Sequence, residues 1–323
     1  MARKKADSSI LQMANDIGVS TATISRVLNG SPHVSGDTRE KVMNAVKKNG
    51  YKLPRPNPGS RIAVICDYLD EISQSGYIAH VLSALIKTIE DRSCYTELYS
   101  ASAFIRKTET FSPDVKGVIV LCGDQMLIRH LKELKNIPIV VLNNQDIKGN
   151  PVVKSNHYQS GRLAAQYLLD NGHKDVGFIA QVLNTSMKTR LKGFVDCFKE
   201  AGIDLDESKC EFAEHTPLYA AMKRLIDQRP SAIFIADESF ALEASYLLKD
   251  VFNVKIPEEI SIISMENPSV SQFITPPLTS VMQPFNEIAS SAVDVIFKHI
   301  RPVKGEDLIF DNKLIKRMSV KEL

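Results

Sequence analysis

The sequence lacks any apolar run long enough to cross a lipid bilayer. The longest runs, such as Ile137–Leu142, have the length of a β-strand, whereas a membrane-spanning helix needs about 20 apolar residues. The apolar core of a signal peptide is also missing, because Ala-Asp-Ser-Ser follows the basic start Met-Ala-Arg-Lys-Lys. We therefore expect a cytoplasmic protein that makes no membrane contact.

Paired cysteines and the motifs of common enzymes are absent as well. The five cysteines are widely spaced without a CxxC pair, and a reduced thiol in an apolar run packs as a small hydrophobic group. The seven histidines show no spacing typical of metal ligands. No glycine-rich phosphate loop follows an expected strand, and Ser239 and Ser264 lack the flanking glycines of a nucleophile elbow. We expect no metal ion, no cofactor and no enzymatic activity.

The net charge of +2 hides an uneven distribution of charge along the chain. Residues 1–61 hold eleven Lys or Arg against four Asp or Glu, a net charge of +7, which leaves −5 for the remainder. A basic segment attached to a mildly acidic body is typical of a head that binds a polyanion. A basic tail or a solvated helix face would give the same charge, so a motif must decide.

Residues 9–49 show three short helical patterns. Ser9, Ser20 and Ser35 are each placed to cap the start of one helix, and Gly18 and Gly50 to end the first and the third. Helices of this length bury little surface alone, so we expect them to pack as one small all-α bundle. Residues 52–61 then contain three alternating prolines, which predict an extended linker and a domain boundary.

From residue 62 onward, short β-branched runs alternate with helical periodicity. The expected buried strands are Ile62–Cys66, Val118–Leu121, Ile137–Leu142, Val176–Ala180, Ala232–Ala236 and Ile260–Ile263. The expected helices include Ile78–Asp91, Gln159–Asn171 and Arg190–Ala201. This alternation predicts an α/β fold with doubly wound parallel sheets, and the length favours two lobes. The domains are then 1–51, a helix-turn-helix; 52–61, the linker; and 62–323, the two-lobed domain.

The stretch QMANDIGVSTATISRVLN, residues 12–29, has the features of a helix-turn-helix. Ala14 is small where two helices cross, Gly18 tolerates left-handed geometry in the turn, and Val19 can fill the core. The exposed face of the second helix carries short polar groups and one arginine, which suit the major groove of DNA. A helical hairpin with a solvated face is the alternative.

The longer stretch GVSTATISRVLNGSPHVSGDTREKVMNAVKKNGY closely resembles the DNA-binding head of the lac repressor family. RLAAQYLLDNGHKDVGFIA, RLKGFVDCFKEAGI, PEEISIISMEN and TPPLTSVMQP follow in the expected order and resemble that family's sensor domain. The resemblance spans nearly the whole chain. It implies a homodimeric transcription regulator, usually a repressor, that binds a pseudo-palindromic double-stranded DNA operator. A small-molecule effector would bind between two periplasmic-binding-protein-like lobes. The competing hypothesis is a solute-sensing protein whose head no longer recognises DNA specifically.

The resemblance assigns DNA contacts residue by residue. Thr21 and Ala22 match the positions that discriminate operator sequence, although Ala22 offers only apolar contact, such as to a thymine methyl. Arg26 matches a position that contacts a base or a phosphate. The positions that match phosphate-positioning residues are Ser20, Thr23, Ser25, Asn29, His33, Ser35 and Thr38. For His33, a surface-loop histidine is the alternative.

The resemblance also implies an effector site, which has diverged. Its expected residues are Tyr77, Asn143, Asn144, Arg190, Asp237, Glu266 and Gln283. A structural ion pair is the alternative role for Arg190, and core packing is the alternative for Tyr77. Neutral residues at 143 and 144, where an Asp-Arg pair is common, remove a carboxylate that would accept sugar hydroxyls. We therefore expect a ligand other than a typical free sugar, or a cleft that has lost its effector.

Two further expectations concern the connections. The family's hinge helix, whose Leu wedges into the minor groove, is replaced here by the proline-rich linker, with Leu53 the only apolar candidate. We hypothesise that the protein binds its half-sites without a central kink, and that the sensor domain acts by spacing two heads. The family topology implies three crossings between lobes. Residues 62–153 and 281–304 would form the lobe nearer to DNA, and residues 154–278 and 307–320 the distal lobe.

Overall fold

The computed structural model describes most of the two-lobed domain and the centre of the head. The described residues are 12–28, 38, 41–42, 44–46, 60–66, 76–107, 115–121, 125–131, 134, 137–143, 149–214, 216–297 and 307–323. Expectations for Ser9, Asn29, His33, Ser35, Gly50, Leu53, the linker prolines and Asn144 lie outside these residues. Within the described part of the chain, no helix combines the length and hydropathy needed to span a bilayer.

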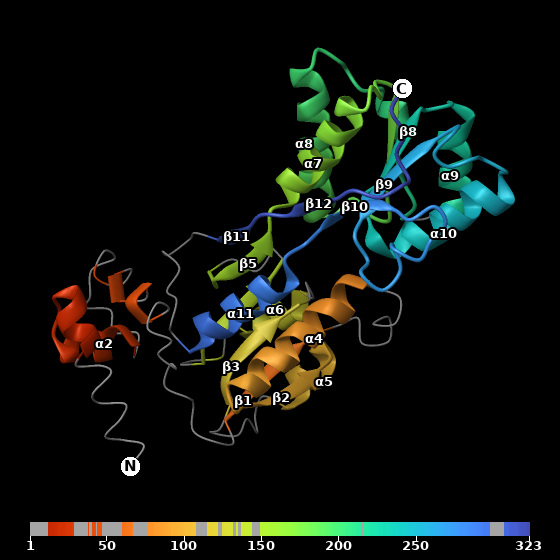
Figure 1. The fold of residues 1–323 in the computed structure, drawn as a ribbon. Coiled ribbons are helices and arrows are strands. Elements are labelled where there is room, and N and C mark those ends of the chain that lie inside the picture. Colours follow the sequence, from red (N-terminus) through yellow and green to blue (C-terminus); the bar gives the residue numbers. More distant parts are fainter. Residues whose placement is uncertain are drawn as a thin grey trace.

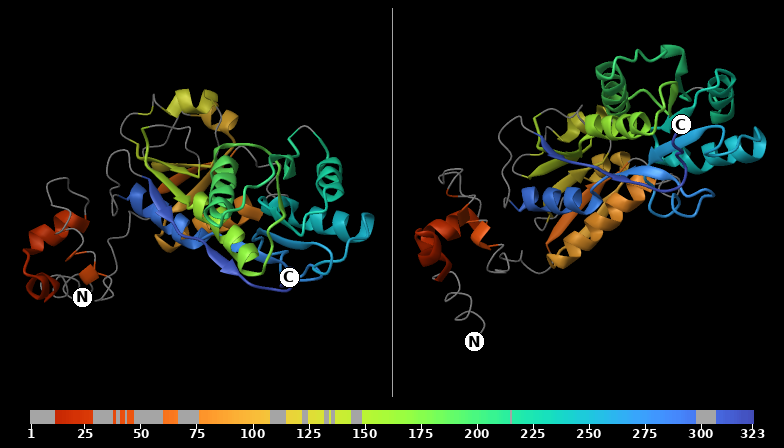
Figure 2. Two further views of the ribbon diagram at one scale, coloured as in Figure 1. Left: turned by 90° about the horizontal axis from the view of Figure 1, so that it is seen from above. Right: turned by 45° about the horizontal axis from the view of Figure 1, so that its top comes forward.

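The head forms a small helical body separate from the two lobes in each view (Figures 1 and 2). Its core is made by Met13 and Ala14 from one helical segment, Ile24 and Val27 from helix α2 (Thr21–Leu28), and a third segment around Val42. Because the three segments bury one side each against the others, the small core matches the bundle expected from the sequence. The turn before α2 contains Gly18, whose φ of +70° is the left-handed geometry predicted for it.

The first lobe, called here the N-lobe, contains a fully parallel six-stranded sheet in the order β11-β5-β4-β3-β1-β2. Its strands are β1 (Arg61–Ile65), β2 (Tyr95–Tyr99), β3 (Val115–Val120), β4 (Ile139–Leu142), β5 (Val152–Ser155) and β11 (Leu308–Phe310). Its helices are α4 (Gly76–Asp91), α5 (Ala101–Lys107), α6 (Gln125–Leu131) and α11 (Phe285–Ile296). Along β1, Ile62 and Val64 pack under α4 and α11, whereas Ala63 and Ile65 face the core that contains α5 and α6. Helices therefore cover both faces of the sheet.

The second lobe, called the C-lobe, repeats this arrangement with the order β12-β10-β9-β8-β6-β7, in which only β12 is antiparallel. Its strands are β6 (Val176–Ala180), β7 (Cys210–Phe212), β8 (Ala232–Ile235), β9 (Ser261–Met265), β10 (Thr279–Met282) and β12 (Lys313–Ile315). Its α-helices are α7 (His157–Asp170), α8 (Thr185–Glu200), α9 (Leu218–Asp227) and α10 (Ala241–Tyr246). Short helical segments are η3 (Glu207–Lys209), η4 (Glu238–Phe240) and η5 (Leu247–Val251). The two-lobed, doubly wound fold is confirmed.

The chain crosses between the lobes three times, as predicted, but at different residues. The crossings lie between β5 and α7, between β10 and α11, and between β11 and β12. The assignment of residues 307–320 to the distal lobe is wrong for β11, because this strand hydrogen-bonds to β5 of the N-lobe. The second crossing follows Met282, since β10 still pairs with β9 of the C-lobe. Short edge strands are assigned by their pairing partners, which their sequence does not reveal.

Candidate effector cleft and DNA-binding surface

The start of α2 has the geometry expected of a recognition helix. The Oγ atom of Ser20 accepts a hydrogen bond from the backbone N–H of Thr23 at 3.0 Å, which confirms Ser20 as the N-cap. The Thr23 hydroxyl lies 2.8 Å from the same oxygen. The next two residues, Thr21 and Ala22, are exposed, so the first turn presents both side chains to whatever approaches the head.

Of the other predicted DNA contacts, the structure describes the side chain of Thr38 alone, which is half-buried in a helical segment. The side chains of Ser25 and Arg26 lie outside the description, although both residues belong to α2. Their roles remain predictions. The described atoms support a capped helix with an exposed first turn.

A cavity of about 480 Å³ lies where the two lobes face each other. Its lining residues from the N-lobe are Tyr77, Ile78 and Asn143. The C-lobe and the crossing segments contribute His157, Gln181, Val182, Asn184, Ser186, Met187, Arg190, Asp237, Glu238, Ser239, Phe240, Glu243 and Gln283. Small-molecule sites enclose roughly 300–1,000 Å³, so this cavity has the size of a ligand site. Five of the expected effector residues line it: Tyr77, Asn143, Arg190, Asp237 and Gln283.

The N-lobe wall is held rigid by its own hydrogen bonds. Asn143, which follows β4 with a φ of +54°, donates from its amide to the Tyr77 hydroxyl. The amide oxygen of Asn143 accepts the backbone N–H of Ser155 at 3.1 Å. Burial raises the pKa of Tyr77, and the ring packs against Phe285 with centroids 5.9 Å apart. Tyr77 thus both packs on the core and lines the cavity.

Arg190 is a buried guanidinium on the C-lobe wall. It donates from Nη1 to the carbonyl oxygen of Ala236 at 2.7 Å and from Nη2 to Nδ1 of His157 at 3.3 Å. Its Nε–H has no partner among the described residues. Burial lowers the pKa of Arg190, and the charges of Glu238 and Asp237 oppose that shift. No described carboxylate forms an ion pair with Arg190, so the alternative of a structural ion pair is not what the geometry shows.

His157 is a site residue that no motif in the sequence indicates. It is the first residue of α7, and packing from the crossing segment and α8 buries it. Burial, followed by the charges of Arg190 and Lys154, lowers the pKa of His157 well below its usual range. The ring is therefore neutral at physiological pH. His157 lies in the site because the start of α7 packs against Arg190 of α8, and such a contact between separate elements leaves no local sequence motif.

Two adjacent acidic residues, Asp237 and Glu238, follow β8 at the cavity edge. The carboxylate of Asp237 caps η4 by accepting the backbone N–H of Ser239 at 3.4 Å, and it also accepts the Ser239 hydroxyl at 2.9 Å. The carboxylate of Glu238 accepts the backbone N–H of Tyr77 at 3.0 Å, so it joins the C-lobe to the first turn of α4 in the N-lobe. Burial and then the charge of Asp237 raise the pKa of Glu238 to about 7, against the opposing effect of Arg190. Sequence reasoning named Asp237 and missed Glu238.

A second contact joins the lobes at the same turn of α4. A Cβ atom added to Gly76 would lie 2.5 Å from the side-chain amide of Asn267 in the C-lobe. His80 on α4 lies 3.5 Å from the hydroxyl of Ser269. The first turn of α4 therefore contacts the C-lobe at two places, and a glycine permits the close approach.

Comparison with known proteins fits this geometry. Residues 9–54 match the family described as bacterial regulatory proteins, lacI family, and residues 165–320 match the periplasmic binding protein-like domain. The head and the two-lobed body thus both match, in the order found in that family. The chain belongs to the lacI family of bacterial regulatory proteins.

Full-length relatives of this lacI-family chain include proteins named HTH-type transcriptional repressor PurR. The one from Pasteurella multocida (strain Pm70) is 28% identical over 342 residues, which cover 97% of this chain and 99% of the relative. The one from Erwinia tasmaniensis (strain DSM 17950 / CFBP 7177 / CIP 109463 / NCPPB 4357 / Et1/99) is 29% identical over 339 residues, covering 97% of each. The solved transcriptional regulator CelR–cellobiose complex has a TM-score of 0.69 and 25% identity, and covers 96% of this chain and 99% of that one.

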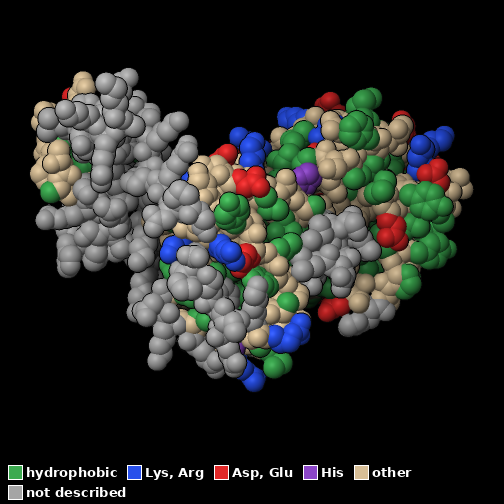
Figure 3. All heavy atoms as spheres, turned by 90° about the horizontal axis from the view of Figure 1, so that it is seen from below, with side chains coloured by type: hydrophobic (Ala, Val, Ile, Leu, Met, Phe, Trp, Pro, Cys, Tyr) green, Lys and Arg blue, Asp and Glu red, His purple; other side chains and the backbone are tan. Residues whose placement is uncertain are grey.

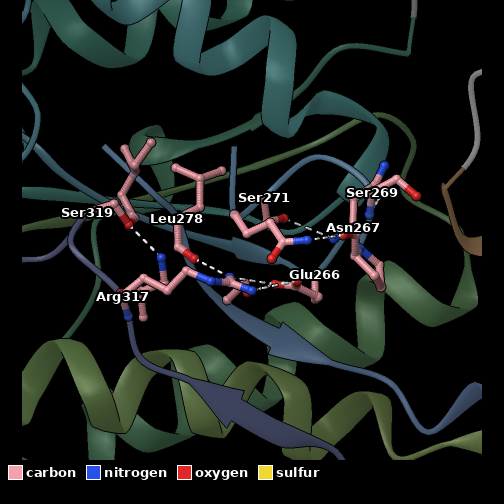
Figure 4. Close-up of polar contacts among 12 residues, drawn as sticks. Glu266, Asn267, Ser269, Ser271, Leu278, Arg317 and Ser319 are labelled. Carbon is pink, nitrogen blue, oxygen red and sulfur yellow. Dashed lines mark hydrogen bonds and ion pairs between the residues drawn. The ribbon is translucent and has the colours of Figure 1, made fainter. Parts of the chain in front are cut away.

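The structure does not place Glu266, an expected effector residue of this lacI-family protein, at the cavity. Glu266 is not among the lining residues, and its carboxylate binds Arg317 through Nη1 at 2.8 Å and Nη2 at 2.9 Å (Figure 4). The Ser280 hydroxyl also donates to it. Because Arg317 lies on the C-terminal segment beyond β12, this buried pair fastens that segment to the C-lobe sheet. The carboxylate is already satisfied and has no free oxygen facing the cavity.

Gln283 lies on the crossing between β10 and α11. Its side-chain oxygen accepts the Ser155 hydroxyl at 2.7 Å, and Ser155 ends β5 at the first crossing. This hydrogen bond therefore ties two of the three connections together. Gln283 is 2% exposed, so it is a fixed part of the cavity wall at the hinge.

Proposed function

We propose that this protein is a sequence-specific DNA-binding transcription regulator, acting as a repressor, whose operator affinity changes when a small molecule binds between its lobes. The observation that carries the proposal is the exposed first turn of a capped helix, at Thr21 and Ala22, on the same chain as a two-lobed body with a ligand-sized cavity. The names of the relatives and of the CelR–cellobiose complex support both halves of this proposal.

The signal passes through the relative position of the lobes. A ligand that contacts both walls stabilises one lobe arrangement, by its differential affinity for the alternative arrangements. The hydrogen bond between Glu238 and the N–H of Tyr77 favours the arrangement in which the two lobes meet at this point. An effector shifts the equilibrium between the lobe arrangements. The linker transmits the change in lobe arrangement to the head, without a central kink in the operator.

We further propose that two copies bind a pseudo-palindromic operator. One small head buries too little surface for a specific site, whereas two heads bind paired half-sites. Apolar side chains gather over the C-lobe on the face shown in Figure 3. Leu242 and Tyr246 on α10 are each 57% exposed, and the nearby Phe273 is 75% exposed. These three residues offer a surface for the second copy.

The remaining parts of the proposal follow from this function. The protein acts in the cytoplasm, on the nucleoid when it is bound to DNA, and it carries out no catalysis. Repression requires only occupancy of the operator, so neither a metal ion nor a cofactor is needed.

Selection of duplexes from random fragments tests the proposal directly. The full chain should enrich a palindromic sequence, and Arg26→Ala should weaken binding to it by about tenfold or more, the expected cost of a lost base or phosphate contact. Lys223→Ala is the matched control, because it removes one exposed positive charge from the C-lobe. Unchanged affinity in Arg26→Ala refutes the assigned docking. A chain that prefers no duplex but still binds a solute would be a sensor without DNA recognition.

A further inference from the structure

Two buried N–H groups beside the cavity have no hydrogen-bond partner among the described residues. One is Nε–H of Arg190. The other belongs to His157: because a guanidinium only donates, Nδ1 of His157 must accept from Arg190, and the proton of the neutral ring is therefore on Nε2. Nε2 is buried and has no partner. Buried donors without partners cost free energy, so an acceptor supplied by a ligand would relieve this cost.

Within the part of the chain that the structure describes, the charged groups of the cavity make no direct contact with a group of opposite charge. The Arg190 guanidinium has two acidic neighbours, Asp237 and Glu238, that act on its pKa, yet forms no ion pair with either. A third acid, Glu243 on α10, is exposed and lines the same cavity. A buried charge without a contacting counter-charge is unfavourable. The cavity thus keeps a positive group and several negative groups apart.

A neutral sugar would satisfy hydrogen bonds but would leave these charges without counter-charges. Glu266, which the resemblance named as an effector residue, is bound to Arg317 and is not among the residues that line the cavity. A ligand with charges of both signs would compensate the positive and the negative groups of the C-lobe wall at once, whereas a simple anion would be repelled by Asp237 and Glu243. The charge pattern therefore favours a dipolar ligand over a neutral or a singly charged one.

We propose that the effector is a zwitterion of the amino-acid type, with its carboxylate bound by Arg190 and His157 and its ammonium group facing Asp237 and Glu243. This inference rests on the proposed function, since it names the ligand class of the same cleft. His157 acts here as a specificity-determining residue. The apolar part of the ligand packs against Met187 and Phe240, which also line the cavity.

The first experiment measures binding to the full chain by calorimetry and by thermal stabilisation. The probes are the common amino acids, the 2-hydroxy acids and primary amines with the same side chains, and glucose, galactose and cellobiose, each up to about 10 mM, which fills sites of millimolar affinity. At least one amino acid should bind saturably. Its hydroxy acid and its amine should each bind at least about tenfold more weakly, because each lacks one charged contact.

The second experiment uses variants of the two donors with that amino acid as the probe. His157→Phe keeps the ring but removes Nε2–H, and Arg190→Lys keeps the charge but removes Nε–H; each should weaken binding about tenfold or more. His157→Gln restores a donor near the Nε2 position and should recover most of the affinity. If His157 had a merely structural role, the Phe and Gln variants would instead bind the amino acid equally weakly, or both would bind it as tightly as the native chain.

The inference is overturned if no amino acid binds, if a hydroxy acid binds as tightly as its amino acid, or if a neutral sugar binds more tightly. Duplex selection with the same preparation distinguishes a failure of this inference from a failure of the proposed function. A chain that selects a duplex but binds no zwitterion retains the proposed function and loses this inference. A chain that selects no duplex loses the proposed function whichever solute it binds.

Discussion

The head and the cleft are built in opposite ways. The recognition surface of the head comes from consecutive residues, and its defining interaction, Ser20 to Thr23, spans three positions. The cleft collects Tyr77, Asn143, Arg190 and Gln283 from elements far apart in the chain. A local surface depends on one helix start, whereas an assembled surface depends on two packed lobes and their crossings.

The two regions also differ in their exposure to water. Thr21 and Ala22 of the head are exposed, whereas Arg190 and Glu238 of the cleft are buried. Charges in a buried site interact more strongly than exposed ones because water screens them less. Substitutions in the C-lobe should therefore change the free energy of unfolding more than substitutions in the head, and the following predictions test that ranking.

The largest loss of stability is expected from a substitution at the contact between α7 and α8, which positions His157 and Arg190. A Cβ atom on Gly161 would lie 2.0 Å from the backbone oxygen of Arg190, so Gly161→Val must separate the two helices. The free energy of unfolding of the C-lobe should fall by about 5 kcal/mol, as expected for a backbone clash in a core. Urea unfolding followed by circular dichroism measures this loss.

Gly202→Ala is the matched control for that variant. Gly202 lies in the same lobe with a φ of +75°, and no atom lies within 4 Å of an added Cβ. Only backbone strain remains there, at a cost of about 1 kcal/mol. Equal losses in Gly161→Val and Gly202→Ala would contradict the close packing of α7 on α8.

A second prediction compares two acidic residues of the C-lobe, the buried and ion-paired Glu266 and the exposed Glu243. Glu266→Gln leaves Arg317 largely buried without its counter-charge, and should lower the free energy of unfolding by about 4 kcal/mol. Glu243→Gln changes an exposed side chain, and should change stability by less than about 0.5 kcal/mol. Chemical unfolding of both variants, with calorimetric titration of the amino-acid probe, checks the pair.

For ligand affinity, the order of the two effects should be reversed: Glu243→Gln should have the larger effect and Glu266→Gln the smaller. Loss of the Glu243 charge should weaken zwitterion binding, whereas folded Glu266→Gln should bind normally. If Glu266→Gln were as stable as the native chain, the ion pair with Arg317 would not stabilise the C-lobe, and Glu266 would be available to a ligand.

The third prediction concerns the pH dependence of stability. The pKa of Glu238 rises from 4.5 to about 7 on folding, so between these values the unfolded state releases the proton that the folded state retains. Stability therefore falls as pH rises through this window, by about 3 kcal/mol in total. Glu238→Gln should remove this loss, and should be more stable than the native chain above pH 7.

The lowered pKa of His157 gives the opposite slope. Below pH 6.5 the unfolded state binds a proton that the folded state refuses, so stability falls as the pH falls. In the native chain the two effects oppose each other between pH 4.5 and 6.5. Unfolding titrations of Glu238→Gln should therefore show increased acid sensitivity, and parallel pH profiles for the variant and the native chain would argue against a buried Glu238.

The sequence predicted three adjacent interior strands in each sheet, and missed the edge strands together with β5 and β10, which lie next to an edge. Buried parallel strands such as β1, β6 and β8 have apolar residues on both faces, which leaves a strong local signal. The edge strand β2, with sequence YTELY, has one buried residue of five, and β11 has only three residues. Their pairing depends on neighbours from distant parts of the chain, which no local pattern encodes.

The candidate site shows the same division. Resemblance identified Arg190 and Gln283, whose family positions retain their residue type. It missed His157 and Glu238, because their roles arise from burial beside Arg190 and from contact with α4. It gave no indication of the ion pair of Glu266, because the partner, Arg317, lies 51 positions away. Partner choice among charged side chains is a property of the folded chain.

The smallest expected effect lies in the head, at the cap of α2. Ser20→Ala removes the oxygen that accepts the Thr23 N–H, which should destabilise the first turn by about 1 kcal/mol and speed amide exchange at Thr23 about fivefold. Ser20→Asn retains an accepting oxygen without adding charge, and should preserve both slow amide exchange at Thr23 and DNA binding.

Ser20→Asp also retains the cap, but its negative charge should repel phosphate and weaken DNA binding while Thr23 exchange stays slow. Hydrogen exchange and duplex binding should thus separate in the Asp variant alone, because Ser20 caps the helix and, in our proposal, also faces the duplex. If the two measurements changed together in all three variants, Ser20 would act only as a cap, and the orientation proposed for Thr21 and Ala22 would lose its nearest support.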